Sequence, residues 1–335
     1  MESILITGAS GFIGSHLVEE ALRRGMQVWA GVRTGSSRKY LQHRKLHVIE
    51  LDMACPERLR AQLSGHKGTY SRWDYVIHCA GATRCRDKGE FDQANYLQTR
   101  HLTEALEELQ MMPRQLIYLS SLSIYGPIHE EDGEPIREGD TPRPDTAYGQ
   151  SKLKAERYLQ AKVGVPYVIF RPTGVYGPRE RDYLLMMKSI RRHIDTAAGV
   201  RPQQLTFVYV RDVVQAIFLS IERHATRRCY LLSDGQVYNS RTFSDLIRRE
   251  LGNPWVVRLT LPLAVLRVVS SLAEWWARLH GRTCTLNSDK YRIMRQRNWQ
   301  CDVTPAMREL GYRPQYNLAR GVTECVAWYR QEGWI

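Results

Sequence analysis

The sequence lacks the cysteine pattern of a disulfide-stabilised or zinc-binding protein. Its seven cysteines form an odd set, and no two of them are spaced as Cys-x-x-Cys. With 335 residues the chain is long enough to bury a sizeable core, so its stability requires neither disulfides nor a metal. We therefore expect reduced thiols, a cytoplasmic location and no metal site.

The sequence also lacks an apolar run long enough to span a membrane. Its longest apolar stretch, residues 259–279, is interrupted by Arg267, Glu274 and Arg278, whereas a spanning helix needs about 18 residues with few or no charges. The first residues, Met1-Glu2-Ser3, show no basic and apolar leader pattern. These features predict a soluble protein without an export signal, whose membrane contact is at most peripheral.

Acidic residues are fewer than basic ones. The 35 Asp and Glu residues and 48 Lys and Arg residues give a formal net charge of +13. Such a charge favours binding to nucleic acid, to an anionic membrane surface or to phosphorylated small ligands. The basic residues are spread along the chain and form no nucleic-acid recognition motif, so we expect a small-molecule substrate and no nucleic-acid partner. A homodimer is an assembly that the sequence leaves open.

Short β-branched runs alternate with longer amphipathic runs as far as residue 171. The near-continuous apolar character of the short runs is typical of parallel strands that are buried on both faces. The fold class is therefore α/β, a Rossmann-like doubly wound parallel sheet with a smaller, mostly helical C-terminal substrate lobe. The strand-like runs lie at 4–7, 27–32, 47–51, 75–80, 115–120, 167–170, 205–210 and 229–233.

The alternation of strand-like and helix-like runs also predicts the domain boundaries. We expect a nucleotide-binding domain over 1–172 that also receives about 205–235. The substrate lobe would then be discontinuous, over 173–204 and 236–335. Segments 125–147 and 196–204 are rich in Gly, Pro and charge without periodicity, so they predict loops.

A glycine-rich turn with the spacing G-x-x-G-x-x-G stands between the first predicted strand and the first predicted helix. Such a turn lets backbone N–H groups approach a pyrophosphate at the positive end of the helix. Glycines also make merely structural turns, but this position favours nucleotide binding. The residues expected to hold the cofactor here are Gly8, Ser10, Gly11, Phe12, Ile13 and Gly14.

The end of the second predicted strand bears on the choice between NADP and NAD. An enzyme that prefers NAD usually carries an acid there for the ribose 2′-hydroxyl, whereas an arginine accepts a 2′-phosphate. Here Arg33 follows the strand, Arg38 lies in the same loop, and no carboxylate occurs before Glu50. The sequence therefore favours NADP, with NAD as the alternative. Solvated loop charges are the other interpretation, and it suits Arg38 better than Arg33.

Tyr148 and Lys152 are four residues apart at the start of a predicted helix, which places both side chains on one helical face. A phenol with an ordinary pKa near 10 is a poor base at neutral pH, but a neighbouring ammonium stabilises the phenolate and lowers that pKa. Tyr148 would then exchange a proton with a substrate oxygen while a hydride passes to or from a nicotinamide. The spacing alone is common by chance, so its neighbours decide the interpretation.

Several further motifs occur in order along the chain, and with the glycine turn and the Tyr148–Lys152 pair they identify a family. The chain resembles the extended short-chain dehydrogenase/reductase family over nearly its whole length. The motifs are Cys79-Ala80-Gly81-Ala82, Asn95 with Thr99, the segment from Ser121 to Tyr125-Gly126, and Arg171-Pro172-Thr173-Gly174-Val175-Tyr176-Gly177-Pro178.

The resemblance implies roles for individual residues. Tyr148 would be the acid/base, Lys152 would hold the nicotinamide ribose and lower the tyrosine pKa, and Ser121 would hydrogen-bond the reacting oxygen. Asn95 resembles a structural asparagine. Further cofactor contacts are implied for Asp52, Met53, Ala80, Gly81, Ala82, Leu119, Pro172, Thr173 and Val175, and substrate contacts for Thr83, Tyr176 and Ser123, the last of which is alternatively a plain loop hydroxyl.

Two branches of this family compete for the substrate. Enzymes of nucleotide sugars generally carry Asn where this chain has Gly174, and an acid where it has Arg33. The C-terminal part is instead similar to 3β-hydroxysteroid dehydrogenases and dihydroflavonol reductases, which implies a secondary alcohol or ketone on an apolar skeleton. A non-catalytic sensor that binds NADP is a third reading; such proteins usually lose the tyrosine or the lysine, and this chain keeps both.

An amphipathic helix is predicted after residue 261, with Pro262 as its first residue. Apolar residues recur along it at steps of three and four, so one face must be buried against a partner. The core of the smaller lobe, the wall of an apolar substrate pocket and a shallow membrane contact are the three candidates. The apolar positions are Val265, Val268, Val269, Leu272, Trp275, Trp276 and Leu279.

Overall fold

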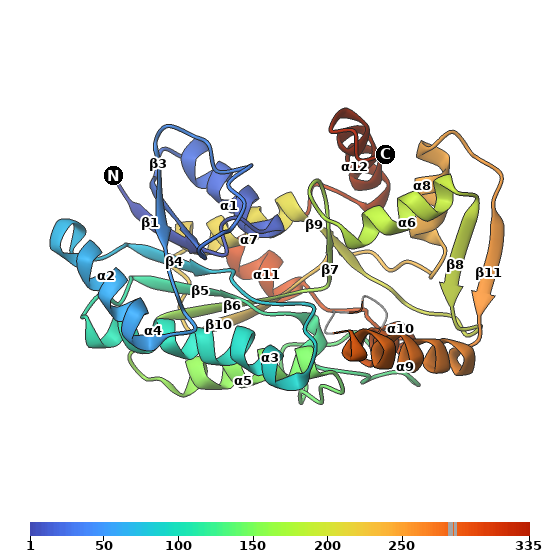
Figure 1. Cartoon of the computed structure of the whole chain (residues 1–335), viewed down its shortest axis with the longest axis horizontal. Coiled ribbons are helices and arrows are strands. Elements are labelled where there is room, and N and C mark those ends of the chain that lie inside the picture. Colours follow the sequence, from blue (N-terminus) through green and yellow to red (C-terminus); the bar gives the residue numbers. More distant parts are fainter. Residues whose placement is uncertain (281–283, 285–286) are drawn as a thin grey trace. The chain divides into compact units, whose positions relative to one another are not determined.

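The computed structural model describes residues 1–280, 284 and 287–335, and it contains a seven-stranded sheet whose strands lie between Ser3 and Leu232 (Figure 1). The strand order is β10-β6-β5-β4-β1-β2-β3, and strands β1 to β6 pair in parallel. The prediction of a doubly wound parallel sheet is confirmed. The strands are β1 (Ser3–Thr7), β2 (Gln27–Val32), β3 (Leu46–Glu50), β4 (Tyr75–His78), β5 (Gln115–Leu119), β6 (Tyr167–Pro172) and β10 (Arg228–Leu232).

The chain order of the strands reverses at β1. In the register of the sheet, Thr7 is paired with Gly31 of β2 on one side and with His78 of β4 on the other. Parallel α/β sheets bind ligands at the carboxyl ends of their strands beside such a reversal. The segments that follow β1, β2 and β4 are therefore the ones that can form a cofactor site.

Helices cover both faces of this sheet (Figure 1). Helices α1 (Phe12–Arg23) and α7 (Val210–Glu222) lie on one face, where the Arg24 guanidinium stacks 4.5 Å from the centre of the Phe218 ring. The opposite face carries α2 (Pro56–Tyr70), α4 (Gln98–Glu108) and α5 (Ala147–Ala161), and α3 (Lys88–Phe91) continues through a π-helical turn (Asp92–Leu97) into α4. Because both faces are covered, the strands are almost wholly buried, as their apolar sequences require.

The chain forms two compact units. Unit 1 comprises Met1–Ser121, Ala147–Arg171 and Val214–Tyr230, and unit 2 comprises Leu122–Thr146, Pro172–Val213 and Leu231–Ile335. The main difference from the expected boundaries is the segment from Leu122 to Thr146, which groups with unit 2. The contacts are non-local: Ile136 forms a bridge with Cys301, and Gln296 Nε2 donates to the carbonyl of Gly126 at 3.0 Å.

Unit 2 contains two small parallel sheets and most of the C-terminal helices. Its core is rich in aromatic side chains, among them Tyr176, Phe207 and Phe243. The strand pairs are β7 (Gly174–Tyr176) with β9 (Phe207–Tyr209) and β8 (Ile194–Ala198) with β11 (Val257–Leu261). The helices are α6 (Asp182–Arg191), α8 (Thr242–Glu250), α9 (Leu263–Leu279), α10 (Ser288–Arg295), α11 (Thr304–Leu310) and α12 (Leu318–Gln331), and Leu122–Ile124 form one 3₁₀ turn.

Strand β8 corrects the first three residues of the expected loop at 196–204. Thr196 and Ala198 are paired with Leu259 and Leu261 of β11, about sixty residues further along the chain. The local sequence, which reads Asp-Thr-Ala-Ala-Gly, carries little strand signal of its own. The strand exists because a distant partner satisfies its backbone hydrogen bonds.

Helix α9 begins at Leu263, one residue later than expected, since Pro262 precedes it and accepts a backbone hydrogen bond from Leu266. Packing of its apolar face into the core of unit 2 is contradicted by the structure. The seven apolar side chains predicted to be buried are instead between 46% and 63% exposed. The helix rests on the other side, through Leu266, Ser270 and Ala277. Among the described residues we find no helix that is long and apolar enough to cross a membrane.

Candidate active site

The glycine turn joins β1 to α1 in a form that only glycine permits at two positions. Gly8 has a φ of +66°, and a Cβ on Gly8 would lie 2.7 Å from the backbone nitrogen of Ala80. A Cβ on Gly14 would lie 2.2 Å from the carbonyl oxygen of Gly8. Gly11 is the N-cap of α1 and has no side chain to cap the first N–H groups, so these groups are available to a phosphate at the positive end of the helix.

Ala80-Gly81-Ala82, which follows β4, is the second predicted wall of a cofactor cradle. Asn95, fully buried on the π-helical turn, holds this segment in two directions: its Oδ1 accepts from Ala82 N at 2.8 Å, and its Nδ2 donates to Ala82 O at 3.0 Å. The same Nδ2 donates to Ser151 Oγ of α5 at 3.0 Å. Asn95 is thus a positioning residue that fastens the cofactor-lining segment to the helix that carries Tyr148.

A buried polar chain beneath this segment involves His78, which the sequence did not single out. Thr99 Oγ1 donates to the carbonyl of Asn95, so it accepts from His78 Nε2 at 3.0 Å, and Thr7 Oγ1 then donates to His78 Nδ1 at 2.7 Å. Burial lowers the pKa of His78 to about 3, with Lys152 contributing in the same direction. His78 is therefore neutral and serves as a spacer between β1 and α4.

The loop after β2 places Arg33, Arg38 and Glu50 at one edge of the sheet. Glu50 ends β3 in register with Val32, and its carboxylate accepts from Arg38 Nη2 at 3.1 Å and from Thr34 Oγ1 at 3.0 Å. Arg33 is exposed. The carboxylate that seemed remote in the sequence is thus adjacent in space, and Arg38 is partly neutralised by it.

Asp52 and Met53, expected beside the adenine, differ in their surroundings. The Asp52 carboxylate forms an ion pair with Arg58 at 3.0 Å, and the carboxylate is 30% exposed. The Met53 side chain is buried in the core of unit 1, and its carbonyl accepts from His101 Nδ1 at 2.8 Å. Any contact of Met53 with an adenine would therefore come from its backbone N–H.

Tyr148 and Ser121 meet in unit 1, as the resemblance implies. Burial raises the pKa of Tyr148 to about 12, and a hydrogen bond with the Ser121 hydroxyl acts in the opposite direction. The ring packs edge-on against Phe91, with centroids 6.2 Å apart. At neutral pH the phenol is therefore protonated and is set to donate a proton. The expectation that Lys152 brings this pKa below its usual value is not met here, because burial dominates.

Lys152 is buried one helical turn further along α5. Its Nζ donates to the carbonyl of Leu119 at 2.9 Å and lies 4.8 Å from the centre of the Tyr118 ring. Burial lowers the pKa of Lys152 to about 8, while Cys79 and Glu156 raise it. A Cβ on the exposed Gly81 would lie 3.2 Å from Lys152 Nζ. The ammonium therefore faces the segment that lines the cofactor cradle.

Helix α5 is locked to the sheet by a buried ion pair that the sequence analysis missed. Arg171 Nη2 lies 2.7 Å from Glu156 Oε2, and Arg171 Nε contacts both carboxylate oxygens. The two side chains are only 6% and 1% exposed. Because Glu156 follows Lys152 by one turn on the same helix, this pair fixes the rotation of the helix that presents Tyr148 and Lys152.

The remaining candidate residues belong to unit 2 or to exposed loops. Thr83 is exposed in the loop after β4, and Ser123 is half-buried in the 3₁₀ turn. Thr173 Oγ1 donates to the carbonyl of Thr206 at 2.9 Å, and Thr173 N donates to the carbonyl of Leu232 at 3.0 Å, so neither of these groups of Thr173 is left to donate to a ligand. Their roles stay predictions.

The structure corrects the expected role of Tyr176. Its side chain is fully buried, its hydroxyl donates to the carbonyl of Asn317 at 3.3 Å, and its ring contacts Tyr209 and Phe243. Tyr176 is a core residue of unit 2 and not a substrate contact. The sequence motif around it did not reveal this, since the aromatic partners lie in distant segments.

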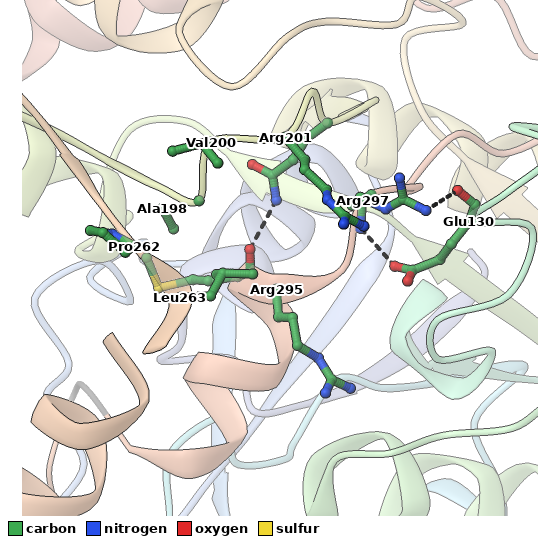
Figure 2. Close-up of a pocket in the computed structure, with 11 residues that line it drawn as sticks. Glu130, Ala198, Val200, Arg201, Pro262, Leu263, Arg295 and Arg297 are labelled. Atoms are coloured by element: carbon green, nitrogen blue, oxygen red, sulfur yellow. Dashed lines mark hydrogen bonds between the residues drawn. The ribbon is translucent and has the colours of Figure 1, made fainter. Parts of the chain in front are cut away.

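A cavity of about 540 Å³ lies within unit 2 (Figure 2). One part of its wall is apolar, and another carries arginines and one carboxylate. Arg297 N donates to Glu130 Oε1 at 2.7 Å, and Arg295 Nη2 lies 3.4 Å from Asp145. The lining residues are Glu130, Ala198, Gly199, Val200, Arg201, Gln203, Pro262, Leu263, Met294, Arg295 and Arg297.

Comparison with known proteins identifies the family. The model of the NAD dependent epimerase/dehydratase family matches residues 4–239, which include the glycine turn, Ser121, Tyr148 and Lys152. The chain belongs to this family. It is accordingly an enzyme of the extended short-chain dehydrogenase/reductase type, as the motifs predicted, with a nicotinamide dinucleotide as its cofactor.

Relatives of this epimerase/dehydratase family member have different activities in their names. The chain is 25% identical over 351 residues to a 3 beta-hydroxysteroid dehydrogenase/Delta 5-->4-isomerase of Mycobacterium tuberculosis, covering 97% of this chain and 90% of the relative. It is 26% identical to an uncharacterized UDP-glucose epimerase, YtcB, of Bacillus subtilis, with 97% of both chains covered. The fold matches a UDP-glucose 4-epimerase of Thermotoga maritima with a TM-score of 0.79 at 22% identity, covering 98% of this chain and 99% of the other.

Proposed function

We propose that this enzyme interconverts a secondary alcohol and a ketone on a small apolar molecule, with a preference for NADP. The observation that carries the proposal is the Ser121–Tyr148 hydrogen bond in a buried site, one helical turn from the Lys152 ammonium. A phenol and a hydroxyl that share one hydrogen bond can both contact a single substrate oxygen. This is the requirement for acid/base catalysis at a carbonyl or alcohol.

The cofactor would be held by the glycine turn, by Ala80-Gly81-Ala82 and by Lys152. The cradle fits a dinucleotide because Cβ atoms at Gly8 and Gly14 would collide with backbone and because the first N–H groups of α1 have no side-chain cap. When bound, the nicotinamide supplies or accepts a hydride at the carbon that bears the reacting oxygen.

The chain's own residues would handle the proton and the oxygen. Ser121 would hold the substrate oxygen by a hydrogen bond, and Tyr148 Oη would donate its proton to that oxygen during reduction. Because burial raises the pKa of Tyr148 to about 12, proton donation is favoured at neutral pH and proton abstraction is not. The phenol therefore already has the protonation state that reduction of a ketone requires. In the reverse direction Lys152 would stabilise the phenolate.

The NADP preference rests on Arg33. Its exposed guanidinium follows β2 at the position where a 2′-phosphate would lie. Glu50 disfavours a 2′-phosphate, since it neutralises Arg38 and brings a carboxylate to the same edge of the sheet. We expect Arg33→Ala to weaken NADPH binding by about tenfold with little change for NADH. Titration of both cofactors tests this, and tighter binding of NADH than NADPH by the native chain would overturn the preference.

A nucleotide-sugar epimerase or dehydratase is the second candidate. The arginines of the unit 2 cavity favour it, since three guanidinium groups could hold a diphosphate. Asp145 pairs with Arg295 at 3.4 Å, Glu130 adds one carboxylate to the lining, and the cavity also has apolar walls at Val200 and Leu263. The balance of the lining therefore supports an apolar molecule.

A cofactor-coupled activity screen separates the two candidates. The panel contains hydroxysteroids, aromatic ketones and nucleotide sugars, with NADPH and NADP as cofactors. Net NADPH consumption with a ketone supports the proposal. Conversion of a nucleotide sugar without net consumption of cofactor, and no reaction with any alcohol or ketone, would replace it with the second candidate.

A further inference from the structure

The exposed apolar side of α9 is unusual for a helix in a folded chain. At about 100° per residue, its seven large apolar side chains cover a continuous arc of about 120° without a charge among them. We call this arc, from Val265 to Leu279, the α9 apolar face. Arg267 lies outside the arc, about 80° beyond one of its edges, on the same side as Glu274, which accepts from Ser288 N toward α10. The face is thus sharply separated from the polar side.

The two tryptophans give this face a particular chemistry. Trp275 and Trp276 are 60% and 54% exposed, and an aromatic ring with a polar N–H is favoured where apolar and aqueous phases meet. The helix has 17 residues and is about 25 Å long. It is too short and too polar on one side to cross a bilayer, but it has the form of a helix that lies in the plane of a membrane surface.

The stretch of sequence that contains this face is rich in positive charge. Residues 251–300 contain eight Lys or Arg and two Asp or Glu, a net charge of +6 out of the +13 of the whole chain. Helix α10, which packs beside α9 (Figure 1), carries Lys290, Arg292 and Arg295, whose side chains are between 39% and 48% exposed. Each of them pairs with one aspartate at 3.4 to 3.8 Å, so part of their charge is offset and the remainder faces solvent. Basic residues next to an apolar strip match a surface that is both apolar and anionic.

A second copy of the chain fits this face less well. Two copies that paired through α9 would each cover a strip about 25 Å long and about 10 Å wide, a footprint of roughly 250 Å². Stable interfaces bury about 800 Å² on each partner. The positive charge around both strips would also repel, whereas an anionic lipid surface would attract it.

We propose that the α9 apolar face docks on the surface of an anionic lipid bilayer. The helix lies in the interface, with the tryptophans and the valine and leucine side chains among the lipid chains and Arg267 and the α10 cations at the headgroups. The unit 2 cavity is lined by Pro262 and Leu263, directly before α9 and at its first residue (Figure 2). Docking would bring that rim of the cavity to the lipid, from which an apolar substrate could enter. Only this last consequence rests on the proposed function.

Sedimentation of the full-length chain with vesicles tests the proposal. Phosphatidylcholine vesicles with and without phosphatidylglycerol are compared at low and high salt. We expect binding to the anionic vesicles that exceeds binding to the neutral ones by about tenfold or more, and that weakens with salt. If the chain stays in the supernatant with both vesicles at low salt, the proposal is wrong.

Variants of the exposed side chains locate the contact. The triple variant Leu272→Ser, Trp275→Ser, Trp276→Ser should bind at least about tenfold more weakly. The matched control is Val163→Ser with Leu185→Ser, two side chains that are exposed at 92% and 50% outside the α9 apolar face; it should bind like the native chain. Unchanged binding of the triple variant would overturn the proposal.

Two further measurements keep the result interpretable. Arg267→Glu leaves every apolar side chain in place, so it should fold normally and lose several-fold in binding to anionic vesicles only. Sedimentation velocity is run on the native chain and the triple variant. A native dimer that becomes monomeric in the triple variant, without vesicle binding by either, would assign the face to a second copy and refute the membrane. The vesicle result is independent of turnover, so it can fail or succeed separately from the proposed reaction.

Discussion

Helices α5 and α9 differ in the kinds of side chain that they bury and expose. Helix α5 buries a lysine and a glutamate, with Lys152 5% and Glu156 1% exposed, whereas α9 exposes two tryptophans and five aliphatic side chains. Charged residues are rarely buried and large apolar patches are rarely exposed. Helix α5 is therefore unusual in its buried charges, and α9 is unusual in its exposed apolar side chains. On α5 the departure marks the chemistry of the site. On α9 it leaves an apolar surface that the described residues do not cover.

The physical cost of the two departures also differs. A buried charge must be compensated inside the fold, and Glu156 is compensated by Arg171 while Lys152 is held by the Leu119 carbonyl. An exposed apolar side chain costs the folded chain little, because it is also exposed in the unfolded chain. Substitutions on α5 should therefore affect catalysis and stability, and substitutions on the α9 apolar face should affect neither.

The largest effect is expected from Tyr148→Phe. Removal of the hydroxyl deletes the proton donor while the ring contact with Phe91 is kept, so turnover should fall by about a thousandfold. NADPH affinity, measured by fluorescence titration, should stay within about twofold. A variant that retains more than a tenth of the native turnover would contradict the acid/base role.

The buried ion pair should dominate the stability of α5. Glu156→Gln leaves the Arg171 guanidinium without its partner charge, so we expect the free energy of unfolding to fall by about 3 kcal/mol, measured by urea denaturation. The matched control is Glu107→Gln, whose partner Lys162 lies at 2.7 Å with both side chains about one-third exposed. That variant should lose less than about 1 kcal/mol. Equal losses would contradict the special role of the buried pair.

Cofactor affinity should depend on pH through Lys152. Burial lowers the pKa of Lys152 to about 8 in the free enzyme, and a bound ribose and pyrophosphate favour the ammonium form. Affinity should therefore be constant below about pH 8 and decline above it, by at most about tenfold per pH unit. NADPH titrations between pH 7 and pH 10 measure this. Lys152→Met has no proton to lose there, so its weaker affinity should be flat, and a flat profile for the native chain would refute the assignment.

The smallest effect is expected on α9. Leu272→Ser should change the free energy of unfolding by less than about 0.5 kcal/mol, because Leu272 is 60% exposed. The comparison is Leu159→Ala on α5, where a fully buried side chain is truncated and about 3 kcal/mol should be lost. Denaturation of both variants tests whether α9 is an external face. A loss above about 2 kcal/mol in Leu272→Ser would show that this face is covered in solution.

Local patterns in the sequence predicted much of the site. The strand at 27–32 has the bounds predicted for it, and the glycine turn joins β1 to α1 as expected. Ser121 and Tyr148 are hydrogen-bonded as the family motif implies. These features depend on neighbouring residues, on helical spacing and on conformations that only glycine adopts, so the sequence carries them directly.

Other features could not be found in this way, because each depends on residues far apart in the chain. Parallel pairing of β2 with β3 brings Glu50 to Arg38, and β11 completes β8. The elevated pKa of Tyr148 comes from burial, which no spacing of residues reveals.

The sequence by itself therefore determined the fold class and the family, and it predicted the cofactor cradle and the Ser121, Tyr148 and Lys152 set, since all of these depend on local spacing. The tertiary structure alone decided that Tyr176 is a core residue, that Glu156 and Arg171 lock α5, and which side of α9 faces solvent. An amphipathic pattern states that a helix has two faces, but only packing against the rest of the chain selects the face that is buried. In α9 that selection left the apolar face outside.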